Sequence, residues 1–241
     1  MEKIVYIIKM KKFLVLTSIT GGKDELEDPS IVFENCDYIA YVDKIYDNIK
    51  VWEQREVLNY TTIDNITDRR NAKPYKIIST IMFPNYEYII WQDGNHKLRI
   101  NPEEIIEKYG KEYDILLFKH PDRTCVYQEM SAVVQWQLDY KELVDYQFRF
   151  YKSVGMPDNF GLYEMSTFIV KNSKEIKELQ LMWFEQIIRF SSRDQISFPY
   201  CLWKMGKKIK KRRLTGFANL HTMNGNRGGN EYFEDKGKHL K

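Results

Sequence analysis

Short apolar runs alternate with amphipathic stretches along the chain. Continuous runs at residues 12–19, 38–42 and 86–92 predict strands buried on both faces of a sheet. Further strands are predicted at residues 57–60, 113–119 and 161–170. Apolar residues at helical spacing predict helices over residues 77–83, 101–109, 128–139, 145–154 and 173–190, and another that starts near residue 191.

This order of elements favours an α/β fold whose site lies where the strands end. The first strand runs into a Gly21-Gly22 turn, the second ends on Asp43, and the third ends on Asp93-Gly94-Asn95. Neither a GxGxxG fingerprint nor a Walker P-loop is present in the sequence. With no linker-like segment, we expect one domain over residues 1–220 and a partly flexible tail over residues 221–241.

Composition adds limits. Hydrophobic residues make up 43% and charged residues 29% of the 241 residues, which is typical of a globular protein. The net charge of +3 is too small to argue for nucleic acid as a partner. Seven cations nevertheless lie within ten residues: Lys204, Lys207, Lys208, Lys210, Lys211, Arg212 and Arg213. They form either a solvated face or a contact with an anionic substrate or membrane surface.

Cysteine usage and hydropathy bear on location. Cys36, Cys125 and Cys201 are odd in number and widely spaced, which favours a reducing compartment. No run approaches the roughly 20 apolar residues that span a bilayer, and the apolar run after Lys12 is too short for a signal peptide. We therefore expect a cytoplasmic protein, with peripheral membrane contact through Lys204 to Arg213.

Candidate chemistry centres on Asp93-Gly94-Asn95. A carboxylate, a glycine and a second oxygen donor at the end of a buried strand suit a hard divalent cation and, through it, a diphosphate. The alternative is an ordinary turn, because these residue types are common turn formers. Asp43, Asp93 and Asn95, with His120 or Glu164, would meet at the same rim of the sheet. Among reactions that need such groups, sugar transfer from a nucleotide sugar fits best.

Several blocks in order resemble one known family: residues 72–76 (AKPYK), 90–95 (IWQDGN), 119–129 (KHPDRTCVYQE) and 193–198 (RDQISF). It is the glycosyltransferase-like domain first catalogued as domain of unknown function 616, which occurs in bacteria and in plant Golgi proteins linked to mucilage and pectin synthesis. The resemblance extends from about residue 17 to residue 221.

The resemblance implies a GT-A fold similar to glycosyltransferase family 8, with a Rossmann-like mixed central sheet flanked by helices. It also implies a metal-dependent nucleotide-sugar site, with Asp93, Asn95 and His221 as ligands. This chain has Asp-Gly-Asn where such enzymes usually have Asp-x-Asp, and an amide oxygen is a weaker ligand than a carboxylate. Plant members carry an amino-terminal membrane anchor, and none is expected here.

Roles follow for individual residues. The donor is expected to contact Thr17, Gly21, Asp43, Arg70, Lys73, Lys76, Asp93, Gly94 and Asn95. The acceptor is expected to contact Arg123, Arg193 and Gln195. Asp194 is the favoured catalytic carboxylate, with Glu164 as its rival and His120 as a further catalytic candidate. Each role has a simpler alternative. Asp194 would only cap its helix, Lys73 and Lys76 would form a solvated helix entry, and His120 would have a structural role.

The sequence thus predicts an enzyme that moves a sugar from a nucleotide donor, most simply a uridine diphosphate sugar, with Mn²⁺ or Mg²⁺, onto a glycan or lipid-linked acceptor. Two alternatives stay open. One is a carbohydrate-binding or nucleotide-sugar-binding protein without turnover. The other is a sugar nucleotidyltransferase, which would want a longer basic glycine-rich loop than Thr20 to Lys23.

Overall fold

The computed structural model describes residues 12–60, 67–218 and 229–237. A seven-stranded sheet forms its centre, in the order β3-β2-β1-β4-β7-β6-β8. The strands are β1 (Phe13–Ile19), β2 (Cys36–Val42), β3 (Glu53–Glu56), β4 (Tyr88–Gln92), β6 (Ile115–Lys119), β7 (Tyr163–Lys171) and β8 (Lys211–Arg213). β5 (His96–Leu98) and β9 (Phe233–Asp235) form a separate antiparallel pair.

The sheet is mixed. β1 pairs in parallel with both β2 and β4, and all five residues of β4 are buried. β7 runs antiparallel between β4 and β6, while β6 pairs in parallel with β8. This arrangement confirms the predicted α/β class with a mixed central sheet flanked by helices.

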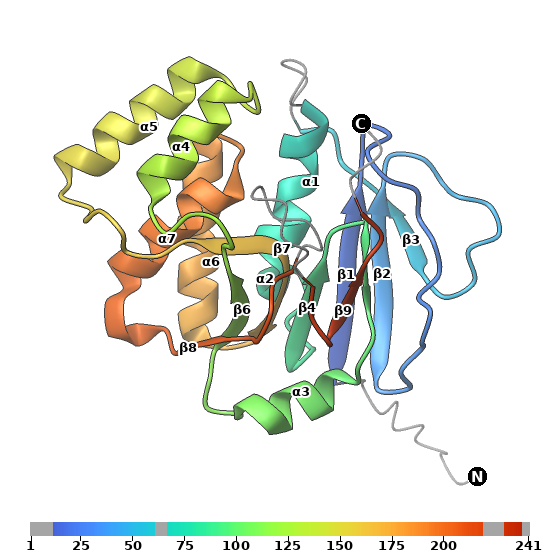
Figure 1. The fold of residues 1–241 in the computed structure, drawn as a ribbon. Coiled ribbons are helices and arrows are strands. Elements are labelled where there is room, and N and C mark those ends of the chain that lie inside the picture. The colour runs from blue at the N-terminus through green and yellow to red at the C-terminus, as the bar shows by residue number, and fades with distance from the viewer. Residues whose placement is uncertain (1–11, 61–66, 219–228, 238–241) are drawn as a thin grey trace, which may run out of the picture.

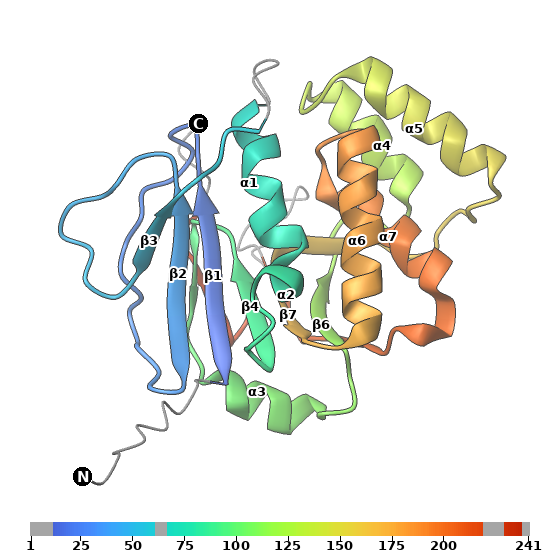
Figure 2. The ribbon, with the colours of Figure 1, turned by 180° about the vertical axis from the view of Figure 1, so that it is seen from behind.

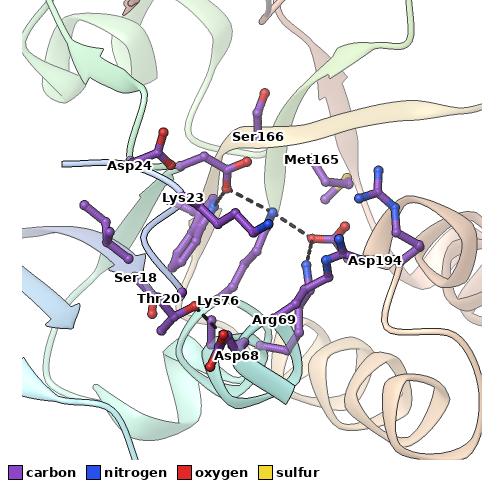
Figure 3. Close-up of a pocket in the computed structure, with 18 of the residues that line it drawn as sticks. Ser18, Thr20, Lys23, Asp24, Asp68, Arg69, Lys76, Met165, Ser166 and Asp194 are labelled. Atoms are coloured by element: carbon purple, nitrogen blue, oxygen red, sulfur yellow. Dashed lines mark hydrogen bonds and ion pairs between the residues drawn. The ribbon is translucent and has the colours of Figure 1, made fainter. Parts of the chain in front are cut away.

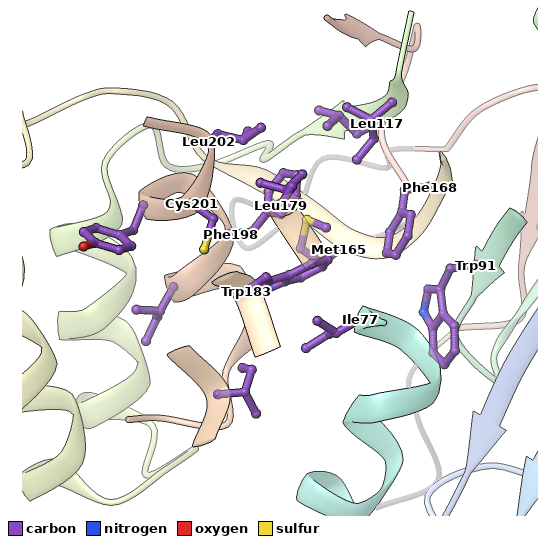
Figure 4. Packing of buried hydrophobic residues seen from close by; sticks show 14 of the residues in the cluster. Ile77, Trp91, Leu117, Met165, Phe168, Leu179, Trp183, Phe198, Cys201 and Leu202 are labelled. Atoms are coloured by element: carbon purple, nitrogen blue, oxygen red, sulfur yellow. The ribbon is translucent and has the colours of Figure 1, made fainter. Parts of the chain in front are cut away.

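The helices are α1 (Thr67–Ile77), α2 (Ser79–Met82), α3 (Pro102–Tyr109), α4 (Val126–Gln135), α5 (Lys141–Ser153), α6 (Lys174–Arg189) and α7 (Asp194–Met205). Figures 1 and 2 show α1, α2 and α6 over one face of the sheet and α3 with β9 over the other. The larger core lies under the first group, where Trp183 and Phe198 pack near Met165 and Phe168 (Figure 4). Trp183 is therefore a core residue.

Helix caps follow the sequence closely. The Asn101 side chain accepts a hydrogen bond from the backbone N–H of Glu103, and the Ser173 side chain accepts one from Ile176. Both satisfy backbone donors that a helix start leaves unpaired. No helix among the described residues has the length and apolar character needed to cross a bilayer.

Two predicted elements are displaced. The third strand lies at residues 53–56 rather than 57–60. The helix expected at residues 77–83 begins ten residues earlier, so its cationic entry is part of α1 itself. Pro74 lies inside α1 and lacks the N–H that would bond to the carbonyl of Arg70. The hydroxyl of Tyr60 donates to that carbonyl instead.

Part of the expected tail packs on the domain. Tyr232 and Phe233 are buried in the second core, and Phe233 lies edge-on to Phe118. The backbone of β9 pairs with β5 at Leu98 and Phe233. Residues 229–237 thus belong to the folded unit, whereas residues 219–228 and 238–241 lie outside the described part of the chain.

Candidate active site

A cavity of about 510 Å³ opens at the carboxyl ends of β1 and β4. Its walls come from the turn after β1, the start of β7, one face of α1, and the first residues of α7. Figure 3 shows side chains from these segments pointing into a common space. This is the rim at which the sequence predicts the site, because ligands of open α/β sheets bind outside the carboxyl ends of the strands.

An ion network crosses the cavity. The ammonium of Lys76 lies 3.2 Å from Oδ1 of Asp93 and 2.7 Å from Oδ2 of Asp194. The ammonium of Lys73 lies 2.9 Å from the same Asp194 oxygen. Oδ1 of Asp194 accepts a further hydrogen bond from the backbone N–H of Gln195. Segments that are more than 100 residues apart thus meet at one carboxylate.

The helices explain this geometry. Lys73 and Lys76 are three residues apart on α1, so both side chains leave the same face of the helix. Arg69 lies one turn earlier on that face and also lines the cavity. Asp194 is in the first turn of α7, where the helix dipole favours a negative charge.

Burial and charge shift the pKa values of the network. Burial lowers the pKa of Lys73 to about 8, and Asp194 offsets part of that effect. Burial also opposes the charge of Lys76, but Asp194 and Asp93 together raise its pKa. Burial alone would raise the pKa of Asp194, yet the two lysines hold it well below its usual range. The carboxylate is therefore ionised and a poor proton acceptor.

Two arginines extend the positive wall. An N–H of Arg69 donates to the carbonyl of Leu138, and burial together with nearby Arg193 lowers the pKa of Arg69. Nε of Arg193 is buried without a hydrogen-bond partner among the described residues. A buried donor of a charged group that lacks a partner costs free energy. A bound anion would supply that partner.

Two hydroxyls in the cavity wall were missed by the sequence analysis. Oγ of Ser18 and Oγ of Ser166 are buried and have no hydrogen-bond partner among the described residues. Ser18 shares the face of β1 that carries Leu14 and Leu16. The alternation of side chains along β1 could have identified it, because Ser18 interrupts that apolar series just where the strand ends.

Several other wall residues were also missed. They are Ile19, Thr20, Lys23, Asp24, Asp68, Ala72, Leu138 and Met165. Asp24 packs against Gly94: a Cβ atom on that glycine would lie 2.9 Å from both Cβ and Oδ2 of Asp24. Sequence offers little signal for them, because loop contacts depend on how separate segments meet. The indole of Trp91 also reaches the cavity and lies 5.3 Å below the ammonium of Lys76.

The structure gathers about half of the predicted site residues. The cavity is lined by Gly21, Lys73, Lys76, Asp93, Gly94, Arg193, Asp194 and Gln195. Predicted donor contacts that do not line it are Thr17, Asp43, Arg70 and Asn95.

Thr17, Asp43 and Arg70 make contacts outside the cavity. Thr17 faces away because residues 17 and 18 point to opposite sides of β1. Asp43 accepts a hydrogen bond of 2.6 Å from the backbone N–H of Gly21 and so supports the turn beside the cavity. Arg70 donates to the carbonyls of Ile187 and Phe190, which ties α1 to the end of α6.

The His120 loop also lies away from the cavity. Nδ1 of His120 accepts hydrogen bonds from the backbone N–H groups of Asp122 and Arg123. Burial lowers the pKa of His120 to about 4. Arg123 forms a buried ion pair with Glu129 and lies over the ring of Trp136. These contacts agree with the structural alternative for His120, and neither His120 nor Arg123 lines the cavity, so their predicted catalytic and acceptor roles stay predictions.

Glu164 is buried on the other side of the sheet. Its Oε2 accepts a hydrogen bond of 2.6 Å from the backbone N–H of Ala218. It is absent from the cavity wall, whereas its neighbours Met165 and Ser166 are part of it. Glu164 therefore anchors the segment after β8 through Ala218, and its predicted catalytic role stays a prediction.

Of the predicted metal ligands, Asp93 and Asn95 lie within the described residues, and their side chains have different partners. The amide nitrogen of Asn95 donates to the carbonyl of Gly237, and Oδ1 of Asn95 lies 2.7 Å from Nδ1 of His96. His221 lies outside the described residues. Asp93 does line the cavity, but its Oδ1 already accepts from Lys76 and from the indole of Trp91. Within residues 12–60, 67–218 and 229–237, no three His, Cys, Asp or Glu side chains are grouped to hold a metal ion.

Comparison with known proteins identifies the family. A probable hexosyltransferase of Arabidopsis thaliana, MUCI70, is 29% identical to the chain over 170 residues. This match covers 66% of the chain and 29% of the length of that relative.

Similar solved structures include the WbbM bifunctional glycosyltransferase in its apo form, at 9% identity with a TM-score of 0.49, covering 86% of this chain and 39% of that one. They also include the mannosyltransferase Ktr4p from S. cerevisiae, at 10% identity with a TM-score of 0.49, covering 84% of this chain and 68% of that one. The model of the TOD1/MUCI70 glycosyltransferase-like domain matches residues 2–223. The chain therefore belongs to the TOD1/MUCI70 family of glycosyltransferase-like domains, as its resemblance predicts.

Proposed function

We propose that the protein transfers a sugar, a hexose in the simplest case, from a nucleotide donor to a glycan or lipid-linked acceptor in this cavity. The observation that carries the proposal is a cavity of about 510 Å³ whose wall combines buried cations with hydroxyls that lack partners among the described residues. The volume suits a nucleotide sugar. The cations suit its diphosphate, and the hydroxyls of Ser18 and Ser166 suit its sugar or ribose.

The reaction is a substitution at the anomeric carbon. The bond from that carbon to the diphosphate oxygen breaks, and its electron pair stays on the nucleoside diphosphate. A bond forms from the acceptor oxygen, whose proton is released to solvent. Negative charge grows on the leaving diphosphate, so the enzyme gains rate by placing positive charge beside it. Lys73, Lys76 and Arg193 are the candidates for that task.

Uridine diphosphate is the proposed nucleotide, and Mn²⁺ or Mg²⁺ is the metal cofactor that the family resemblance implies. When bound, such a cation would add positive charge at the diphosphate. Of the two predicted ligands within the described residues, Asp93 lines the cavity, and Asp24 of the same wall packs against the adjacent Gly94. The predicted set of Asp93 with Asn95 does not fit the cation, because the amide of Asn95 is engaged elsewhere.

The acceptor is proposed to enter beside Arg193 and Gln195, at the start of α7. We also propose that the protein works in the cytoplasm and contacts acidic membrane surfaces through Lys204 to Arg213. All seven cations of that segment are exposed, which suits contact with an acidic surface. The three cysteines are buried thiols, which agrees with a reducing compartment.

A donor screen tests the proposal. The protein is incubated with uridine, guanosine, adenosine and cytidine diphosphate sugars, with and without Mn²⁺, and the products are separated by chromatography. Release of a nucleoside diphosphate that requires Lys76 is expected. Lys76→Met should abolish it, whereas Lys207→Met, which changes an exposed lysine, should not.

Other outcomes select the alternatives. Release of pyrophosphate would indicate a sugar nucleotidyltransferase. Binding of a nucleotide sugar without any turnover would indicate a non-catalytic protein. Either result would overturn the proposed transfer reaction.

A further inference from the structure

The positive charge beside Asp93 comes from a lysine side chain in this structure. Asn95 directs its amide into hydrogen bonds with Gly237 and His96, and Asp93 already accepts from the ammonium of Lys76. A lysine thus lies where the predicted motif would put a metal ion. The question is what this lysine and its neighbour do for the donor, and the answer rests on the proposed nucleotide-sugar function.

Asp194 determines where the two lysines lie. Its Oδ2 receives both ammonium groups, at 2.9 Å from Lys73 and 2.7 Å from Lys76. Its side chain and that of Lys76 are less than one-tenth exposed. Lys76 also pairs with Asp93, so the two lysines and the two carboxylates balance in charge, and an anion would be bound by the N–H donors that this network leaves over. Figure 3 shows Asp194 and Lys76 directed toward each other across the cavity.

Lys73 has donors to spare. An ammonium carries three N–H donors, and among the described residues Lys73 makes one hydrogen bond, to Asp194. Its side chain is 12% exposed, and that exposed part lies in the cavity wall. The buried Nε of Arg193, on the neighbouring helix start, adds another donor without a partner among the described residues.

We propose that Lys73 and Lys76, positioned by Asp194, bind the diphosphate of the donor directly and neutralise the leaving group, so that nucleoside diphosphate binds without a divalent cation. Lys73 supplies the N–H donors that contact the diphosphate. Lys76, which lies between Asp93 and Asp194, supplies a second positive charge close by. Asp194 acts as a positioning residue. It is unsuited to remove a proton, because three donors already occupy its oxygens.

Calorimetric titration with uridine diphosphate and with uridine, in buffer containing EDTA, tests the proposal on the full chain. Wild-type protein should bind uridine diphosphate at least 10-fold more tightly than uridine in EDTA. Lys73→Met should remove most of that preference and leave the affinity for uridine unchanged. Lys73→Arg should retain the preference, because the charge and several N–H donors remain. Lys207→Met serves as the matched control and should behave as wild type.

The outcomes separate this inference from the proposed function. If uridine diphosphate binds only with Mn²⁺, and Lys73→Met binds it as well as wild type does, the inference is wrong while the function stands. If neither uridine diphosphate nor the other nucleoside diphosphates bind under any condition, the proposed function itself fails.

A second measurement avoids dependence on a variant that does not fold. Circular dichroism first establishes whether Lys73→Met is folded. Inorganic pyrophosphate is then titrated against wild-type protein saturated with uridine diphosphate, again in EDTA. Displacement supports direct binding by the lysine pair, and failure of millimolar pyrophosphate to displace the nucleotide overturns it.

Discussion

At the scale of single residues, Asp194 and Lys73 form a titratable unit. Burial lowers the pKa of Lys73 to about 8, and Asp194 raises it toward its ordinary value. The groups that face Lys73 are Asp194, Lys76 and, at longer range, Asp93. As pH rises through about 8, Lys73 loses its proton and hence its attraction for an anion, whereas the raised pKa of Lys76 keeps that lysine charged.

The affinity for uridine diphosphate in EDTA should therefore fall between pH 7.5 and 9.5, a window above the ordinary titration of the phosphates. Lys73→Arg should flatten this decline. Asp194→Asn should move it to lower pH, because the carboxylate no longer favours the ammonium of Lys73. Titration calorimetry across the pH range measures all three. An unchanged pH dependence of binding in Asp194→Asn would mean that the carboxylate does not hold Lys73 in its charged form.

His120 gives a second prediction, in the opposite pH range. Its folded pKa of about 4 is below the ordinary value of 6.5, so the unfolded chain binds a proton first as pH falls. Stability linked to His120 is therefore complete above pH 6.5 and is lost between pH 6.5 and 4. The loss should approach, at most, about 3 kcal/mol.

Urea denaturation at several pH values measures this effect. His120→Asn keeps an acceptor for the backbone N–H groups of Asp122 and Arg123 but cannot titrate. Its free energy of unfolding should depend less on pH over that window than that of wild type. Equal dependence in the two proteins would mean that His120 is not held in its neutral form.

At the scale of elements, β9 closes the second core although it lies near the end of the chain. Phe233 is 2% exposed and packs against Phe118. Phe233→Ala should lower the free energy of unfolding by about 3–5 kcal/mol, because it leaves a cavity beneath the β5–β9 pair. Urea denaturation gives the value. Phe148→Ala is a suitable control because Phe148 is 38% exposed, and its loss should be clearly smaller.

Sequence patterns predict some elements better than others. Phe13 to Ile19 and Tyr88 to Gln92 are buried on both faces, so continuous apolar runs identify them. The start of α1 escapes this reasoning because its first turns carry charged residues and a proline, and only tertiary contacts show that these cations are part of the helix. Likewise β8 consists of Lys211, Arg212 and Arg213, which have no apolar pattern.

The same contrast applies to the site. Asp93 and Lys76 could be predicted because strand ends and helix faces follow simple periods. The contacts of Asn95 could not be predicted, because its amide donates to Gly237, which the β5–β9 pairing brings close. Arg70 was assigned to the donor for a similar reason: its partners at the end of α6 are more than 100 residues away in sequence.

At the scale of the whole molecule, charge is unevenly distributed. β8 forms one edge of the sheet, and the exposed cations of residues 204–213 lie along it and before it. Charged residues on an edge strand also discourage pairing with another sheet. Each cation near an acidic membrane surface contributes about 1 kcal/mol to binding, so a cluster of this size gives salt-sensitive association.

Co-sedimentation with vesicles tests that expectation. Wild-type protein should sediment with vesicles containing phosphatidylserine at low salt and dissociate as salt rises. A variant with Lys204, Lys207, Lys208 and Lys210 changed to Gln should lose most of the association. A control with Lys44, Lys50, Lys141 and Lys174 changed to Gln carries the same net charge and should retain it. Equal behaviour of the two variants would contradict a specific role for the segment.

The antiparallel strand β7, between β4 and β6, has a consequence for how the protein is made. On the ribosome, β3, β2, β1 and β4 are complete about 70 residues before β7 begins to emerge, and until then the apolar edge of β4 has no neighbour. The cavity wall is likewise made in two stages. Lys73, Lys76 and Asp93 precede β7 in the chain, whereas Ser166 and Asp194 follow its start. Nascent chains that stall before residue 163 should therefore aggregate and lack any donor site, so the late strand both completes the pocket and ends the most vulnerable stage of synthesis.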